Sequence, residues 1–198
     1  MRKLAFSLLF YVTVLFLISP MATAEEKWIG DVNIRLGQKN LTPDHWKPVA
    51  DQPMIGMDID FGKESWPAHI LLTLSGSARQ ASEKSSVITG PDIEGSTSEF
   101  GFGVKTHYLY EGFNPFLTLG LSWTNASLTG NPDTTGQVTD KDNYRMGIFL
   151  SGGVTYKIME KFNVGGEIRL LRNSEVTLFG ETGDADYISY SLILGWGF

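Results

Sequence analysis

Residues 190–198, YSLILGWGF, alternate between apolar side chains and mostly small ones up to the last residue of the chain. One phase of this alternation is apolar throughout: Tyr190, Leu192, Leu194, Trp196 and Phe198. A period of two is typical of a β-strand with two unlike faces. The terminal residues of most domains are poorly ordered unless something ties them down. This apolar end therefore predicts a strand that faces hydrocarbon and closes a barrel.

The same period recurs along the chain. Seven further segments alternate apolar side chains with Gly, Ser, Thr or charged ones: residues 28–36, 55–61, 70–77, 99–108, 117–123, 145–156 and 162–170. Together with the last segment they predict eight strands, each with one apolar and one polar face. The 22 glycines in the chain fit a strongly curved sheet, because glycine in a strand often marks a bend.

The connections between these segments alternate in length. Long polar connections cover residues 37–52, 79–97, 126–142 and 172–186, and short ones cover residues 62–67, 109–115 and 157–161. This layout is typical of barrels in the outer membrane, and an even strand number leaves no unpaired edge in hydrocarbon. The sequence therefore predicts an all-β fold: an eight-stranded antiparallel up-and-down transmembrane β-barrel. The long connections are expected outside the cell and the short turns in the periplasm.

A soluble barrel of the lipocalin kind is the main alternative, because it also alternates. Its outer face should be dense in Lys, Glu, Asn and Gln, whereas the polar phase here is mainly Gly, Ser and Thr, which fit inside a narrow barrel. Aromatic residues lie near the ends of the apolar phase, as in a membrane girdle: Trp28, Phe61, Tyr108, Trp123, Tyr156, Phe162 and Trp196. Both observations favour the membrane barrel.

The first 24 residues combine a basic start, an almost wholly apolar run and small residues before Glu25. These are the features of a cleavable signal peptide, and the run is shorter than the roughly 20 residues that span a bilayer. We expect a signal peptide at residues 1–24 and a mature barrel domain at residues 25–198; a retained membrane anchor is the alternative. Export without cysteine excludes a disulfide framework, and a net charge of -6 disfavours nucleic acid as a partner.

The last strand also carries a family resemblance. Its spacing from Tyr190 to Phe198 resembles the C-terminal signal that the outer-membrane assembly machinery recognises. Over residues 27–198 the chain is similar in topology to the small eight-stranded outer-membrane proteins of Gram-negative bacteria, such as OmpX and the membrane domain of OmpA. The resemblance implies contact with outer-membrane lipid, lipopolysaccharide and the assembly machinery, and a monomer. No soluble domain is expected after Phe198, so a peptidoglycan-binding role is not implied.

Charged residues in the polar phase are expected inside the barrel. They are Asp31, Arg35, Asp58, Asp60, Glu99, Lys105, Arg145, Glu167 and Arg169. An eight-stranded interior is just wide enough for side chains, and an unpaired buried charge costs several kcal/mol, so we expect a paired network. Five of these residues are predicted to meet near mid-barrel: Arg35, Asp58, Lys105, Glu167 and Arg169.

Catalytic and metal-binding motifs are weak. Enzymes with barrels of this size, the lipid A palmitoyltransferases and deacylases, need a histidine with a serine or acidic helper near the outer leaflet. His69 and His107 are expected at the periplasmic end, and His45 has no serine close in sequence. Residues 180–186, GETGDAD, bring Glu181, Asp184 and Asp186 close together, but without the spacing of an EF-hand loop. We expect a solvated acidic loop, no metal, no cofactor and no enzymatic activity.

The sequence thus favours an outer-membrane barrel with a plugged interior and a structural or surface-interaction role through its four long connections. Apolar residues in these connections fit a binding surface: Val87, Ile88, Leu178 and Phe179. A narrow channel for small solutes or apolar molecules is the first alternative. An outer-leaflet enzyme that modifies lipid A is the second.

Overall fold

The computed structural model describes residues 26–42, 46–81, 89–131 and 138–198. The signal peptide predicted at residues 1–24, His45, Val87 and Ile88 lie outside the described residues. Within these ranges the chain forms ten strands: β1 (Trp28–Leu41), β2 (Asp51–Lys63), β3 (His69–Ala81), β4 (Thr89–His107), β5 (Phe113–Asn131), β6 (Val138–Lys157), β7 (Phe162–Arg172), β8 (Glu175–Leu178), β9 (Glu181–Asp184) and β10 (Tyr187–Gly197). No helix in the described ranges is long and apolar enough to cross a bilayer.

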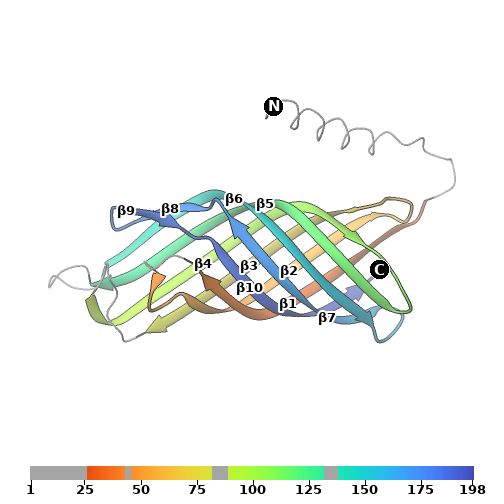
Figure 1. Cartoon of the computed structure of the whole chain (residues 1–198), viewed down its shortest axis with the longest axis horizontal. Coiled ribbons are helices and arrows are strands. Elements are labelled where there is room, and N and C mark those ends of the chain that lie inside the picture. Colours follow the sequence, from red (N-terminus) through yellow and green to blue (C-terminus); the bar gives the residue numbers. More distant parts are fainter. Residues whose placement is uncertain (1–25, 43–45, 82–88, 132–137) are drawn as a thin grey trace, which may run out of the picture.

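Eight of these strands close an antiparallel barrel in the order β1-β10-β7-β6-β5-β4-β3-β2 (Figure 1). The first and last strands pair directly over eleven positions, from Asp31 opposite Gly197 to Leu41 opposite Tyr187. The predicted eight-stranded barrel, closed by the last segment of the chain, is confirmed. Strands β8 and β9 form a separate hairpin at the end of the barrel opposite the C-terminus (Figure 1).

Outward side chains are apolar through the middle of each barrel strand and are exposed in the isolated chain, as a lipid-facing surface requires. Leu192 on β10 is 70% exposed, for example. Aromatic rings pair across neighbouring strands at both ends of this band, Phe113 with Tyr156 at 4.8 Å and Phe100 with Trp123 at 6.0 Å between ring centroids. The predicted apolar phase is therefore the outer face of the barrel.

The long connections were predicted wrongly in extent, the second and third most of all. Strands β4 and β5 are 19 residues long and β6 is 20 residues long, so much of residues 79–97 and 126–142 continues the strands. Backbone pairing extends to Ala81 opposite Ile93 and to Gly130 opposite Val138. Beyond the lipid band both faces of a strand can be polar, so the period of two no longer marks strand residues in the sequence. The three short turns lie where they were predicted.

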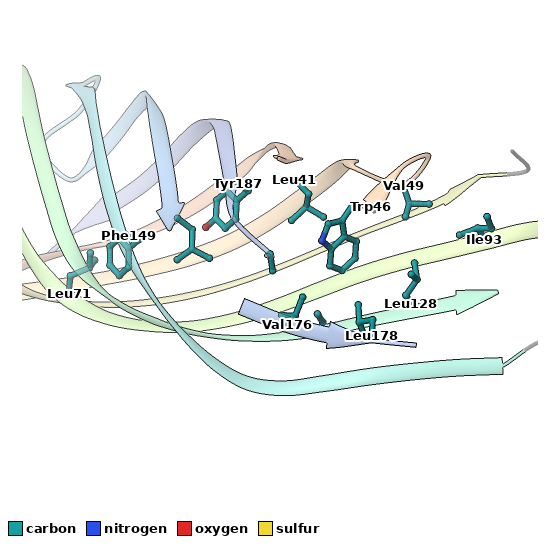
Figure 2. Packing of buried hydrophobic residues seen from close by; sticks show 13 residues of the cluster. Leu41, Trp46, Val49, Leu71, Ile93, Leu128, Phe149, Val176, Leu178 and Tyr187 are labelled. Carbon is teal, nitrogen blue, oxygen red and sulfur yellow. The ribbon is translucent and has the colours of Figure 1, made fainter. Parts of the chain in front are cut away.

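A cluster of buried apolar side chains fills the barrel interior at the long-connection end. Trp46 is completely buried there, and in Figure 2 it lies among Leu41, Val49, Val176 and Leu178. Its indole Nε1–H donates to the backbone oxygen of Asp184 at 3.0 Å. The first connection and the β8–β9 hairpin thus fold together into an apolar cap, which the polar plug predicted from the sequence did not include. We call this group of residues (Leu41, Trp46, Val49, Ile93, Leu128, Val176, Leu178) the cap.

Candidate functional site

Four charged residues form an ion-paired cluster near the middle of the barrel interior. Arg35 Nε lies 3.0 Å from Asp58 Oδ2, and Arg35 Nη1 lies 3.5 Å from Glu167 Oε2. Arg169 contacts the same two carboxylates, at 3.5 Å from Asp58 Oδ2 and 3.2 Å from Glu167 Oε1. Both guanidinium groups also donate to Thr73 Oγ1, at 2.8 and 3.0 Å. All four charges are buried, and each is compensated by two opposite charges.

Lys105 was predicted to join this cluster, and that prediction is wrong. Lys105 Nζ lies 2.5 Å from Asp60 Oδ1, and His69 Nδ1 lies 3.1 Å from the other oxygen of the same carboxylate. Lys105 pairs with His69 across β3 and β4, several rows nearer the short turns than Thr73. Lys105 does face the interior, as predicted. Its side chain is too far along the barrel from the central cluster to reach it.

A third cluster lies between the central charges and the cap. Lys39 pairs with Glu99, and its ammonium also donates to Thr97 Oγ1 at 2.9 Å. The Tyr187 hydroxyl donates to Glu99 Oε2 at 2.8 Å, and Lys39 Nζ lies 4.3 Å from the centroid of the Tyr187 ring. The sequence reasoning missed Lys39 because it placed residue 39 in the first long connection. Because Arg35 faces inward and side chains of a strand alternate, Lys39, four residues later, faces inward too. Extending the alternation past residue 36 would have predicted this.

Two more of the predicted interior charges have different surroundings. Asp31 is half-buried at the short-turn end, where it accepts a hydrogen bond from Asn163 Nδ2 at 3.2 Å. Arg145 is not inside the barrel, because its side chain is 46% exposed and lies 2.8 Å from Asp142. The pairing of β5 with β6 shifts beside it, and Tyr144 has a φ of 62°, so the alternation of faces breaks there.

The β8–β9 hairpin is fixed to the barrel by carboxylates of β6. Asp142 Oδ2 accepts from the backbone N–H of Thr177 at 2.6 Å, and Asp140 Oδ2 accepts from that of Phe179 at 2.5 Å. These side chains take the place of a backbone ladder between β6 and β8. Burial raises the pKa of Asp142, but the Thr177 hydrogen bond and the Arg145 guanidinium outweigh it and hold the pKa below its ordinary value of 3.8.

The acidic loop residues do not gather into a metal site. Asp186 accepts from the backbone N–H of Ser174 at 3.1 Å and lies 3.7 Å from Arg172, while Glu181 and Asp184 are strand residues of β9. Among the described residues, no group of three or more His, Cys, Asp or Glu side chains is arranged to hold a metal ion. From the short turns to the cap, the interior is filled by ion pairs, with buried apolar side chains such as Phe116 and Phe149 against them, and then by the apolar cap. The barrel is plugged.

Residues 10–198 match a family model described as the outer membrane protein beta-barrel domain. The chain belongs to this family. Its apolar outer band, its closed sheet and its plugged interior are therefore those of a protein of the outer membrane. Comparison with curated proteins gives no significant match.

Solved structures of outer-membrane proteins share the fold. The attachment invasion locus protein Ail of Yersinia pestis matches with a TM-score of 0.57 at 11% identity, over 87% of this chain and 99% of that one. Neisserial surface protein A matches with a TM-score of 0.54 at 12% identity, over 86% and 95%. A major outer membrane protein of Thermus thermophilus matches with a TM-score of 0.56 at 10% identity, over 86% and 99%. At such identities the likeness is one of fold alone.

In this outer-membrane barrel, all five residues predicted as the assembly signal point to the lipid-facing side of the last strand. Tyr190, Leu192, Leu194, Trp196 and Phe198 are all exposed in the isolated chain. The backbone N–H of Phe198 donates to Gly30 O at 3.0 Å, so the pairing of the last strand with β1 reaches the final residue. The predicted signal is thus a continuous apolar stripe beside the seam where the barrel closes.

Proposed function

We propose that this outer-membrane barrel is a surface-interaction protein that acts through its long-connection end and transports nothing through its interior. The observation that carries the proposal is the platform beyond the lipid band: the paired extensions of β3 to β6, with the β8–β9 hairpin fixed beside them by Asp140 and Asp142. Outer-membrane barrels have short periplasmic turns and longer extracellular loops, so this platform faces the outside of the cell.

The plugged interior separates this proposal from a channel. A solute would have to displace the cap, the Lys39–Glu99 pair and the central ion pairs in turn. Breaking one buried pair typically costs about 3–5 kcal/mol, so a steady open pathway is strongly disfavoured.

Lipopolysaccharide is the proposed lipid partner at the base of the platform. Arg145 and Arg172 lie on neighbouring strands just beyond the apolar band, and their side chains are 46% and 54% exposed. Each has an acidic neighbour, Asp142 or Asp186, so the guanidinium groups are held in place. Guanidinium groups suit phosphate because they can donate two parallel hydrogen bonds. We further propose that the last strand is recognised by the assembly machinery and that the folded barrel is a monomer.

Two measurements test the function. Purified protein in a planar bilayer should give no steady single-channel steps, and regular steps would favour the narrow channel instead. Nanodiscs that carry the barrel should bind host-cell or matrix surfaces. Nanodiscs that carry a variant without the extensions of β4 and β5 beyond the lipid band should not. Equal binding by both kinds of nanodisc would contradict a role for the platform.

A further inference from the structure

Three buried oxygen atoms, one in the central ion-paired cluster and two from it toward the short turns, lack a hydrogen-bond donor among the described residues. They are the side-chain oxygens Asn33 Oδ1, Asn163 Oδ1 and Asp58 Oδ1. Their residues are only 3%, 5% and 7% exposed. A buried acceptor without a donor destabilises the folded state, so three of them in one part of the barrel need a physical explanation.

These residues lie in one row across four neighbouring strands. Asp58 pairs with Asn33 across β2 and β1, Asn33 pairs with Gly195 across β1 and β10, and Gly195 pairs with Asn163 across β10 and β7. All of them face inward. The row therefore has an oxygen-bearing side chain on each side of a position that has no side chain.

Gly195 is the reason why the two amide oxygens approach each other. A Cβ atom at this position would collide with Asn33 Oδ1 and with Asn163 Oδ1. The orientation of Asn163 is set independently, because its Nδ2 donates to Asp31 at 3.2 Å and so turns its Oδ1 toward the glycine. Two electron-rich atoms thus point into the same small space and repel each other unless a positive or donating group lies between them.

We propose that this row is a binding site for a monovalent cation of the sodium or potassium class, held by Asn33 Oδ1 and Asn163 Oδ1 above Gly195 with Asp58 Oδ1 alongside. The atoms that lack a partner here are oxygen acceptors, and the nearby Asn163 Nδ2 already donates to Asp31, so the space suits a hard cation and not an anion. A divalent ion prefers several carboxylates, whereas the one carboxylate here already contacts the guanidinium groups of Arg35 and Arg169. The half-buried carboxylate of Asp31, which accepts from Asn163 Nδ2, adds a negative charge beside the site and so favours a cation.

The site can be tested by following stability against the nature of the cation. The urea midpoint of the wild-type barrel in detergent micelles is measured in sodium, potassium and N-methylglucamine chloride at constant ionic strength. We expect a midpoint that rises and saturates with sodium or potassium and is lower in N-methylglucamine, because a bulky organic cation cannot reach two buried amide oxygens. A crystal soaked in thallium(I) should show an anomalous peak between Asn33 and Asn163.

Gly195→Ala is the decisive variant, since its methyl group would push only the flexible ends of two amide side chains aside. We expect it to lower the cation affinity at least tenfold. Gly166→Ala is the matched control, because this glycine lies on the outer face of β7 with its nearest atom at an ordinary 3.7 Å. If Gly195→Ala does not fold, Asn33→Leu removes one oxygen with little change of shape and should have the same effect.

Three results would overturn the proposal. The first is an equal midpoint in all three chlorides with only ordered water between the amides. The second is a full cation response in Gly195→Ala. The third is a response to calcium but to neither monovalent ion.

Discussion

The barrel interior is filled in two different ways: by ion pairs from the short turns to the central cluster, which we call the lower interior, and by apolar side chains in the cap. Toward the short turns the barrel is filled mainly by ion pairs, such as those of Arg35, Asp58 and Glu167, with apolar side chains such as Phe149 against them. All of these residues come from barrel strands. Toward the long connections it is filled by apolar side chains, of which Trp46 and Val49 come from the first connection and Val176 and Leu178 from the hairpin. The lower part is thus completed by the sheet itself, whereas the cap requires segments outside the sheet to fold over it. The two regions should respond differently to mutation.

The largest effect is expected from Glu167→Ala in the central cluster. It leaves Arg35 and Arg169 with only the Asp58 carboxylate, and an uncompensated buried charge typically costs about 3–5 kcal/mol. The urea unfolding curve in micelles should shift by about this amount for the whole barrel. Removing Glu167 and Arg169 together should cost less than the single change. An unchanged midpoint for Glu167→Ala would mean that the ion pairs do not stabilise the lower interior.

Trp46→Ala should have an effect of about 3 kcal/mol that stays in the cap, because the indole is completely buried and leaves a cavity. We expect faster hydrogen exchange and faster proteolysis in residues 172–186, while the unfolding midpoint of the barrel changes little. Leu128→Ala, in the same cap but on a barrel strand, is the comparison variant. A fall in barrel stability as large as that for Glu167→Ala would show that the cap and the sheet are one cooperative unit.

Acid should loosen the hairpin by about 1 kcal/mol before it affects the sheet. The pKa of Asp142 in the folded protein lies below 3.8, so its stabilisation is fully present above pH 3.8 and is lost as the pH falls through that lowered pKa. The backbone amide of Thr177 should lose protection from hydrogen exchange in this window. In Asp142→Asn the same amide should be less protected at neutral pH and should depend little on pH. Identical profiles for the two proteins would rule out this carboxylate as the attachment.

The smallest effect on stability is expected at Phe198, although its effect in cells should be large. Loss of a lipid-exposed ring should cost about 1–2 kcal/mol, because lipid fills the space and no fixed cavity remains. If the stripe from Tyr190 to Phe198 is the assembly signal, deleting Phe198 should sharply reduce outer-membrane levels while the variant still refolds from urea into micelles. Normal levels in the membrane would reject the signal, and failure in both assays would make Phe198 a stability residue.

The contrast between the two regions also explains what could be predicted from the sequence. In the lipid band the outer face must be apolar and the inner face small or paired, so the period of two placed the strands, Arg35, Glu167 and Arg169 on the right faces. Beyond the band this constraint ends, so Lys39 was taken for a loop residue. Arg145 is exposed beside a bulge, and a bulge depends on pairing with β5 that no local pattern reveals. The cap was missed because Trp46 meets its partners only after the barrel has formed.

The hydrogen bond from Trp46 to Asp184 joins two residues that are 138 positions apart in the chain. Bringing such distant segments together in an open chain has a high entropic cost, but pairing of β1 with β10 places them side by side at no further cost. The indole therefore becomes buried only when the first and last strands have met in the correct register. In a variant that keeps Trp46 as its one tryptophan, its fluorescence would report barrel closure, and it would distinguish a finished barrel from one whose strands have formed but whose seam is still open.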